Sequence, residues 1–406
     1  MRASFVQRCV LQKLGRSLTT RVELMHAGRR LAAGNNGDCN WRQYSFVHAA
    51  VFGEGTAALT VDNAAAHPVV ALRVVQDSKQ AGGGADQRAV VEDAAAAGGE
   101  KGLVLHIHDA SVPMGNGAFG AVFKGTVHGA LGRAQWSVAV KKFFMLEQPL
   151  LYGFANAAAV LAWVERDLLP EINVLAGLAH PNVVRLRGVG LAPVHGVTVP
   201  AYVAMDLCDG GTLEHWLRDD KLTDVCVVGF LSDMVDGMLY LHDVKRIVHR
   251  DIKPDNLFVR VGLPSEQRPT LVIGDVGLAK KVTRTVSMVS AAGAVAYRAP
   301  EAMVDAARCS AASDVYTASL VAVELVTGQQ VYGTCGDDVA AKRGLTDRAR
   351  AQVSAMVEFA DDSTMTVAAT DVLLSACTIA DVAARPTFRA IAAARDTGVD
   401  GAGADF

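Results

Sequence analysis

The sequence predicts an α+β fold in which a small, strand-rich lobe precedes a larger, mainly helical lobe. The strand-length apolar runs of the first lobe are 103–107, 138–144, 183–191 and 201–207. One helical period, over 161–178, interrupts these runs and predicts a single main helix there. Beyond Gly211 apolar residues recur at helical spacing, most clearly over 225–241 and 318–326, which predicts the helical lobe.

Composition divides the 406 residues into an extension, a folded domain and a tail. Two stretches rich in glycine and alanine, 81–86 and 94–99, are typical of linkers. Before them, Val69–Val75 is a short apolar run with strand character. We predict a partly disordered N-terminal extension at 1–102, a domain at 103–393 with lobes at 103–207 and 208–393, and a flexible tail at 394–406.

Charge and hydropathy limit the class of partner. Hydrophobic residues make up 51% of the chain and charged residues 20%, which suits a globular core. A formal net charge of -3 gives no overall attraction to nucleic acid, so we expect no nucleic-acid partner. No uninterrupted apolar run approaches the roughly 18 residues of a membrane-spanning helix, so we expect no membrane span.

The cysteines and the N-terminal segment bear on location. The 7 cysteines are scattered and contain no CxxC pair, which is typical of reduced thiols and not of disulfides or a zinc site. We therefore expect a cytoplasmic protein. A mitochondrial location is the alternative, because residues 1–36 are basic and contain one acid, Glu23.

A glycine-rich segment is the first candidate for phosphate binding. It has the pattern GxGxxGxV, and its glycines let backbone N–H groups approach a phosphate closely. A dinucleotide-binding loop requires a helix after the third glycine, but the next residues have strand character. The residues that we expect to contact a nucleotide here are Gly115, Asn116, Gly117, Ala118, Phe119, Gly120 and Val122.

A lysine and a glutamate form the candidate ion pair of the site. Lys141 ends an apolar strand, and we expect its ammonium to face phosphate oxygens, whereas alternation places Lys142 on the opposite face. Glu171 lies on a helical pattern and is the expected partner of Lys141. Pro170 directly precedes it, so the helix either kinks or begins there. Glu165 is the alternative partner.

The most specific motif is HRDxKxxN, at residues 249–256. Its residue types suit phosphoryl transfer: Asp251 to orient an attacking hydroxyl, Lys253 to neutralise the moving charge, and Asn256 to bind a metal. Asp275 follows between an apolar strand and a glycine, and its carboxylate suits Mg²⁺. The spacing of these groups predicts a catalytic centre for phosphoryl transfer.

In this order the motifs resemble the eukaryotic protein kinase domain, over residues 103–393. The resemblance implies a bilobal fold, with an antiparallel N-lobe sheet carrying one main helix and a mostly helical C-lobe. Lys253-Pro254 resembles the serine/threonine type, and Ser313–Tyr316 and Cys377–Phe388 resemble the tyrosine-kinase-like branch. The activity implied is transfer of the ATP γ-phosphoryl group to a serine or threonine hydroxyl of a protein substrate.

The same resemblance assigns further residues to the nucleotide and the metal. It implies that Asn256 and Asp275 hold Mg²⁺, that Asp251 is the catalytic base and that ATP lies in the cleft between the lobes. The additional nucleotide contacts that it implies are Ala139, Met205, Asp206, Leu207, Cys208 and Phe258.

Residues from Asp275 to Glu301 resemble an activation segment. We expect an upstream kinase to phosphorylate this segment and Arg250 to bind the added phosphate. We also expect Glu301, at a helix start, to pair with Arg385. The candidate phosphorylation sites are Thr283, Thr285, Ser287 and Ser290.

The sequence departs from the family pattern at three places. Val276 replaces the usual phenylalanine, which predicts a looser regulatory stack with Leu186, Leu175 and His249. Gly293-Ala294 and Ala318-Ser319 replace Gly-Thr and Phe-Gly. These departures leave a pseudokinase acting as a nucleotide-binding scaffold as the alternative. A small-molecule phosphotransferase is disfavoured by the Ala-Pro-Glu segment.

Overall fold

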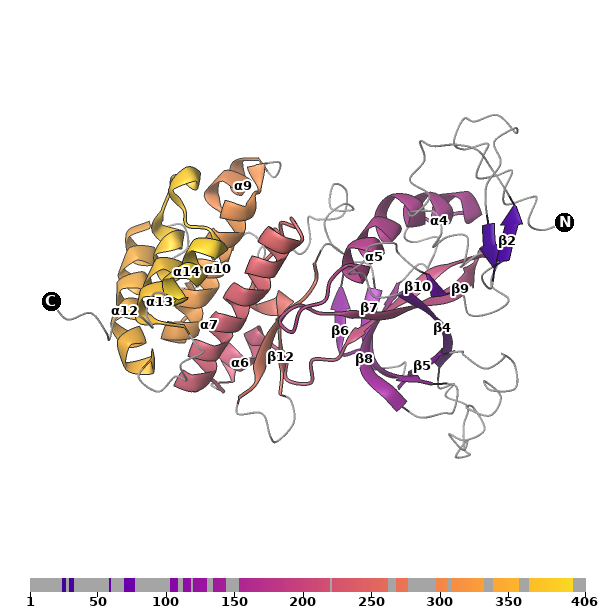
Figure 1. Cartoon of the computed structure of the whole chain (residues 1–406), viewed down its shortest axis with the longest axis horizontal. Helices are drawn as coiled ribbons and strands as arrows, with labels where there is room; N and C mark the ends of the chain where they lie inside the picture. The colour runs from indigo at the N-terminus through magenta and orange to yellow at the C-terminus, as the bar shows by residue number, and fades with distance from the viewer. Residues whose placement is uncertain are drawn as a thin grey trace. The chain divides into compact units, whose positions relative to one another are not determined.

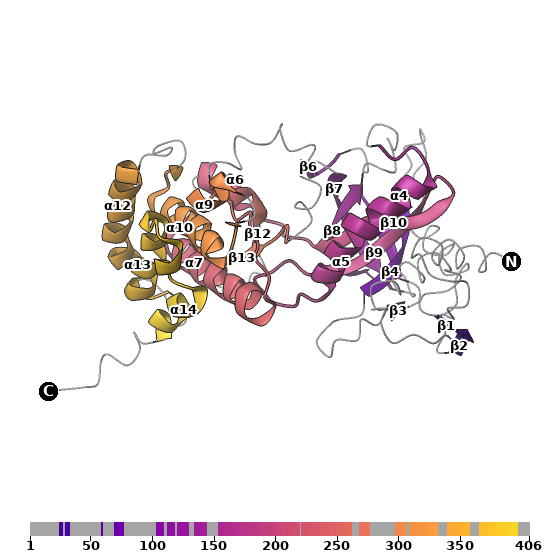
Figure 2. The ribbon, with the colours of Figure 1, turned by 90° about the horizontal axis from the view of Figure 1, so that it is seen from above.

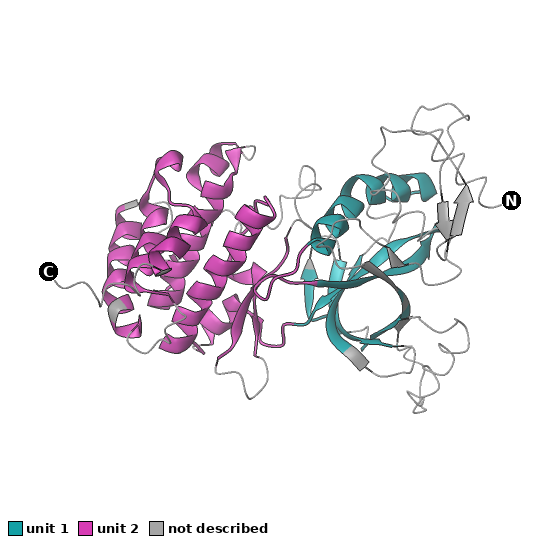
Figure 3. Ribbon diagram, viewed as in Figure 1, with its two compact units in different colours: residues 1–177, 186–207 teal, residues 178–185, 208–406 magenta. Residues whose placement is uncertain are grey.

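The computed structural model of the chain divides into two compact units (Figure 3). Unit 1 comprises residues 1–177 and 186–207, and unit 2 comprises 178–185 and 208–406. The division after residue 207 coincides with the lobe boundary that the sequence predicts, but 178–185 belongs with unit 2. The residues that the structure describes are 24–26, 29–32, 58–59, 69–76, 103–108, 112–117, 120–129, 134–143, 153–219, 221–261, 268–276, 297–305, 308–331, 339–357 and 365–396.

Unit 1 contains an antiparallel sheet with the strand order β5-β7-β8-β10-β9, and the short strand β6 (Gly115–Gly117) pairs with β7 (Figure 1). Alternation explains why these segments form a sheet. In β7, Phe123 and Val127 are buried on one face, whereas Lys124 between them is exposed. The main strands are β5 (Leu103–Ile107), β7 (Gly120–His128), β8 (Ala134–Phe143), β9 (Leu186–Val194) and β10 (Val197–Asp206).

A further strand, β4 (Val69–Gln76), comes from the predicted N-terminal extension. It pairs in parallel with β5 on one edge and with β9 on the other, so the strands β4, β5, β7, β8, β10 and β9 close into a barrel. Figure 2 shows β4 beside β9. The sequence predicts a purely antiparallel sheet that begins at residue 103, so the parallel strand is an addition to that expectation. The remaining strands are β3 (Ala58–Leu59), which pairs with β4, and the separate hairpin of β1 (Leu24–His26) and β2 (Arg29–Ala32).

The main helix of unit 1 is built from α4 (Ala157–Trp163), a π-helical turn η3 (Val164–Leu168) and α5 (Leu169–Ala176). Asn156 caps α4 by accepting a hydrogen bond from the N–H of Ala159. In the π turn the N–H of Leu169 bonds to the carbonyl of Val164. Pro170 then lies in the first turn of α5, where its missing N–H costs little. The helix therefore continues through this proline, because α5 begins one residue before it and the π turn joins α5 to α4.

Unit 2 is mainly helical, with one small three-stranded sheet. Its longest apolar helix passes a length and composition test for membrane crossing over Asp224–Val244, but 78% of the apolar window is buried, as in the core helix of a folded domain. The elements are β11 (Gly211–Thr212), α6 (Leu213–Arg218), α7 (Asp224–Leu239), η4 (Tyr240–Val244), η5 (Pro254–Asn256), β12 (Leu257–Arg260), β13 (Thr270–Ile273), α9 (Pro300–Val304), α10 (Ala311–Thr327), α12 (Val339–Val357), α13 (Val367–Ser375), η7 (Ala376–Thr378), η8 (Val382–Ala384) and α14 (Phe388–Asp396).

The core of unit 2 is centred on α10, which packs against α7, α12 and α13. Ser319 is fully buried in this helix, and its hydroxyl donates to the carbonyl of Leu374 and accepts from the N–H of Cys377. The serine that departs from the family pattern thus joins α10 to the turn after α13.

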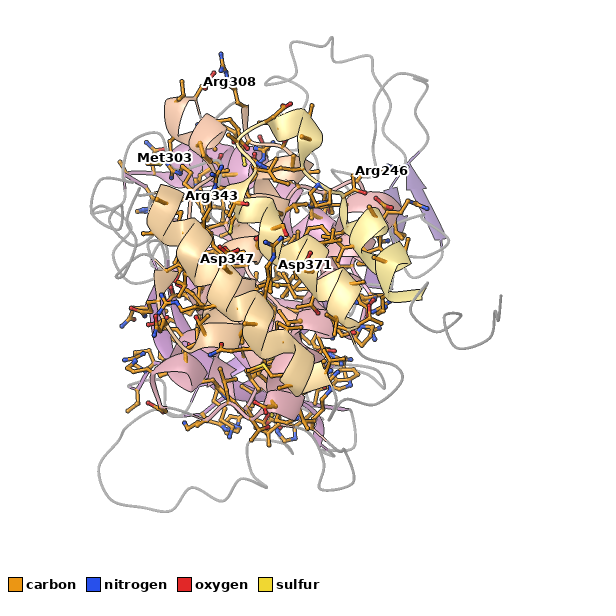
Figure 4. The ribbon with its side chains drawn as sticks, turned by 90° about the vertical axis from the view of Figure 1, so that its left-hand side faces the viewer. Arg246, Met303, Arg308, Arg343, Asp347 and Asp371 are labelled. Atoms are coloured by element: carbon orange, nitrogen blue, oxygen red, sulfur yellow. The ribbon has the colours of Figure 1, made fainter. Side chains whose placement is uncertain are left out.

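The outer helices of unit 2 show the amphipathic pattern of a surface layer. Along α12, Leu345 and Ala349 are buried, whereas Arg343 and Asp347 point to the face shown in Figure 4. Asp371 on α13 lies beside them and pairs with Arg350 at 2.5 Å (Figure 4). These helices therefore bury one side and leave a charged outer face.

Candidate active site

The glycine-rich segment forms a tight hairpin. Gly115 pairs with Val122 and Gly117 with Gly120, so β6 and the start of β7 run antiparallel side by side. Lys142 contributes its carbonyl oxygen to the base of this hairpin, because a Cβ at Gly120 would lie 2.3 Å from that oxygen. Glycine is required here by close backbone packing.

Lys141 lies in the middle of the sheet, opposite Val122 of β7 and Val203 of β10. Its ammonium lies 5.9 Å from the centroid of the Phe143 ring, on the same face of β8. The ammonium of Lys142 lies 6.0 Å from the Phe123 ring. The two lysines therefore occupy opposite faces, as alternation predicts.

Glu171 is buried in the first turn of α5, and Glu165 is half-buried in the π turn. The ion pairs described within unit 1 are Arg166–Asp167 and Arg187–Asp206. A Lys141–Glu171 pair is not among them, so the pair stays a prediction.

The end of β10 carries three of the expected adenine contacts, Met205, Asp206 and Leu207. Met205 is the strand neighbour of Ala139 in β8, which places two expected contacts side by side. The carboxylate of Asp206 is bound by Arg187 of β9. Because this side chain is held by the sheet, the backbone is the part of the segment available to a nucleotide.

The HRDxKxxN motif of unit 2 forms a compact loop before β12. The amide nitrogen of Asn256 donates to the carbonyl of Asp251 at 2.8 Å and to its carboxylate Oδ2 at 2.9 Å. The ammonium of Lys253 lies 3.4 Å from the same Oδ2. Asn256 is buried, whereas the side chain of Asp251 is 26% exposed. The structure therefore brings two of the expected catalytic residues, Asp251 and Lys253, together with the expected metal ligand Asn256, and leaves the carboxylate accessible.

Asp275 is joined to this loop through the neighbouring glycine. The N–H of Gly274 bonds to the carbonyl of Asn256, and its carbonyl lies 2.9 Å from Nε2 of His249. The ring of Phe258 packs against Gly274, where a Cβ would lie 2.3 Å from the ring. Asp275 itself has a left-handed backbone with φ of 56°, an uncommon conformation for a residue other than glycine.

The donors of this region fit a magnesium ion. Since the amide nitrogen of Asn256 is directed at Asp251, its oxygen is the end that remains for a metal. Carboxylate and amide oxygens are hard ligands, and Mg²⁺ completes its shell with water and substrate phosphates. Among the residues that the structure describes, no group of three or more His, Cys, Asp or Glu side chains is arranged to hold a metal.

Comparison with known proteins places these motifs in a family. The model of the protein kinase domain matches residues 109–395. The chain belongs to the protein kinase domain family.

Individual kinases share 28–33% of their residues with this chain over the segments that match. Serine/threonine-protein kinase atg1 of Dictyostelium discoideum is 28% identical over 224 residues, which cover 54% of this chain and 30% of that protein. Mitogen-activated protein kinase kinase kinase 11 of Homo sapiens is 30% identical, over 54% of this chain and 24% of that protein. Inhibitor of nuclear factor kappa-B kinase subunit beta of Bos taurus is 33% identical, over 39% and 21%. The chain thus matches less than a third of the length of these relatives.

Asp314 of the kinase domain has a role that sequence reasoning did not assign. Its buried carboxylate accepts hydrogen bonds from the backbone N–H groups of His249 and Arg250, both at 2.6 Å. A ring nitrogen of His242 lies 2.9 Å from the same carboxylate. Arg250 adopts φ of 68°, so Asp314 holds the catalytic loop in a conformation that its backbone does not favour. The Ser-Asp-Val-Tyr landmark was the available signal.

The predicted pair between Glu301 and Arg385 is confirmed. The guanidinium donates to both carboxylate oxygens, at 2.7 Å and 2.9 Å, and Ser313 donates to one of them. Burial acts to raise the pKa of Glu301, but the hydrogen bonds from Arg385 and Ser313 outweigh it and leave the pKa below its ordinary value. The pair therefore fixes the start of α9 to the end of the domain.

A second buried carboxylate, Glu324, supports Tyr297 at the start of the same region. It accepts hydrogen bonds from the Tyr297 hydroxyl and from the N–H of Val331. Burial raises the pKa of Glu324 to about 7. Burial and the Glu324 charge likewise raise the pKa of the Tyr297 hydroxyl.

Two residues of the predicted regulatory stack differ in burial. Val276 is almost fully buried, whereas Leu186 is only half-buried.

Other predicted residues lie outside the part of the chain that the structure describes. They are Ala118, Phe119, Thr283, Thr285, Ser287, Ser290 and Ala294.

Proposed function

We propose that the chain is a serine/threonine protein kinase of the tyrosine-kinase-like branch, which transfers the γ-phosphoryl group of ATP to a protein hydroxyl. The convergence of Asn256 and Lys253 on the Asp251 carboxylate carries this proposal. The Lys253-Pro254 pair supports the serine/threonine type. The stretches Ser313–Tyr316 and Cys377–Phe388 support the branch.

In the proposed reaction Asp251 accepts a hydrogen bond from the substrate hydroxyl and orients its oxygen towards the γ-phosphorus. The new oxygen–phosphorus bond forms as the bond to the β-phosphate oxygen breaks, which releases ADP. The hydroxyl proton passes to the Asp251 carboxylate. Lys253, 3.4 Å from that carboxylate, is placed to offset charge on the transferring group.

The other predicted residues act on the triphosphate. Lys141 binds the α- and β-phosphates, and the backbone of the β6–β7 hairpin covers the phosphates. Asn256 and Asp275 would hold Mg²⁺, which when bound neutralises charge on the triphosphate. Positioning and charge neutralisation together account for most of the rate that this chemistry needs.

The experiment is phosphorylation of a peptide array by the full chain with ATP and Mg²⁺, compared with the Asp251→Asn variant. We expect serine or threonine peptides to be labelled and the variant to lose about 10²–10⁴-fold of the rate. Asp219→Asn, an exposed aspartate paired with Lys221, is the matched control and is expected to keep full activity. Equal background labelling by wild type and Asp251→Asn would favour the scaffold alternative.

We also propose that an upstream kinase phosphorylates one or more of the four hydroxyls of the activation segment, and that Arg250 binds the product phosphate. Arg250 is exposed, which suits that role. The test replaces the set Thr283, Thr285, Ser287 and Ser290 with alanine in the full chain. Activity equal to that of the phosphorylated wild type would refute the proposal.

A further inference from the structure

Strand β4 closes a sheet that would otherwise have two open edges. It forms five residue pairs with β5, from Leu72–Leu103 to Gln76–Ile107, and two with β9, Ala71–Val189 and Leu72–Gly190. Without β4 both β5 and β9 would present unpaired backbone N–H and C=O groups to their surroundings. A strand from the N-terminal extension therefore satisfies both edges at once.

The side chains of β4 complete an apolar interior. Leu72 is 3% exposed. The neighbouring strand β5 contributes Leu105 and Ile107, which are fully buried. Replacement of Leu72 by a charged residue would thus place a charge among apolar groups, which is strongly unfavourable.

The sequence of β9 fits this strand at one position in particular. A Cβ at Gly190 would lie 2.4 Å from Cγ2 of Val74 and 2.9 Å from Cβ of Tyr202. Glycine at this position therefore leaves the space that Val74 occupies. The two strands are matched in shape as well as in hydrogen bonding.

The strands that β4 joins lead directly to the proposed nucleotide contacts. β5 pairs with β7, and beyond it the N–H of Met114 bonds to the carbonyl of Val122, at the base of the glycine hairpin. β9 carries Arg187, which binds Asp206 at the end of β10. A change in the seating of β4 would therefore reach both the phosphate and the adenine ends of unit 1.

We propose that residues 69–76 are an intramolecular strap of the kinase domain, and that nucleotide affinity depends on its insertion between β5 and β9. The nucleotide part of this inference rests on the proposed function, whereas the strap itself does not. The N-terminal extension then acts on catalysis from within the fold, because withdrawal of the strap opens the barrel and loosens the hairpin that covers the phosphates.

The test uses the full chain with Leu72→Asp, and Val74→Thr as a milder variant should the first not fold. Val112→Asp, at a site 63% exposed, is the control for an added charge in unit 1. Amide hydrogen exchange over 103–107 and 186–190 reports strap seating, and titration with ATP and Mg²⁺ reports affinity. We expect both Leu72 and Val74 variants to lose protection in both segments and to bind ATP about fivefold or more weakly, with the control unchanged.

The outcomes separate the two claims. Unchanged protection in both variants would overturn the strap, and lost protection with unchanged ATP affinity would overturn its link to the nucleotide. If wild type itself binds no ATP, the proposed function fails, and the exchange data still decide whether β4 is seated.

Discussion

The catalytic loop of unit 2 and the strands of unit 1 around Lys141 are positioned by different means. Asp314 and Asn256 hold the loop through buried side-chain hydrogen bonds, several of them to backbone groups. In unit 1 the position of Lys141 follows from backbone pairing with β7 and β10. The buried hydrogen bonds fix the backbone of the loop in one conformation. The position of Lys141, in contrast, changes if the strands that pair with β8 shift. We therefore expect the catalytic loop to be pre-organised and the nucleotide side to be adjustable.

The largest expected effect tests the rigid side of this comparison. In Asp314→Ala the N–H groups of His249 and Arg250 lose a buried acceptor, so we expect a loss of about 3–5 kcal/mol in the free energy of unfolding. The maximal phosphorylation rate should fall more than the affinity for ATP changes. Denaturant unfolding and steady-state kinetics measure both quantities. Asp347→Ala, on an exposed face, is the control, and an equally small effect of both variants would contradict the prediction.

The position of Lys141 in unit 1 is tested by replacing its predicted partner, Glu171. Glu171→Gln should lower the phosphorylation rate by about tenfold or more, because it removes the carboxylate expected to orient the lysine. Glu165→Gln, the alternative partner, should change the rate by less than about twofold. Steady-state kinetics at varied ATP decide between the two. The reverse order of effects would assign the pair to Glu165.

The pH dependence of stability tests a second buried carboxylate of unit 2, that of Glu324. The pKa of Glu324 is raised from an ordinary value of 4.5 to about 7, so the folded chain binds its proton more tightly than the unfolded chain. The stability from this group is therefore complete below pH 4.5 and is lost as the pH rises to about 7, with a slope of at most about 1.4 kcal/mol per pH unit. Glu324→Gln should flatten this part of the profile, measured by thermal unfolding between pH 5 and 8. Asp347→Asn, at an exposed aspartate of α12, is the control, and a profile that Glu324→Gln leaves unchanged would refute the assignment.

The smallest expected effect on the phosphorylation rate concerns Ser319, the serine that joins α10 to the turn after α13. Ser319→Ala removes a buried hydroxyl, so the N–H of Cys377 loses its acceptor and the carbonyl of Leu374 loses one of its two donors. This loss should cost about 1–3 kcal/mol of stability. Catalytic constants should stay unchanged, because the contact lies in the core. Chemical denaturation gives the first quantity and kinetics the second. A large loss of rate at unchanged stability would contradict this interpretation.

The sequence predicted the parts of the fold whose signals are local. Alternation in β7, the helical period of α7 and the spacing of the motif around Asp251 each identify a structure within a few residues. The pair Glu301–Arg385 was predicted from the resemblance, although its members are far apart in the chain. The role of Asp314 was not predicted, because its partners lie 64 and 65 residues away and an isolated aspartate gives no sign of them.

The strand β4 was missed as part of the domain for a related reason. The apolar run Val69–Val75 has strand character, but the sequence of a short run does not determine which strand it pairs with or whether the pairing is parallel. The Gly-rich stretches that follow it favoured a boundary at residue 102. The fit between Val74 and Gly190 appears only when both strands are placed.

The π turn at Val164–Leu168 has a consequence for how this helix compares with others. A turn of this kind holds one residue more than an α-helical turn, so side chains before it are rotated relative to those after it. Trp163 and Glu171 therefore do not keep the angular relation that an uninterrupted helix would give them. Deletion of one residue within the turn is the change that would bring the two halves of the helix back into phase.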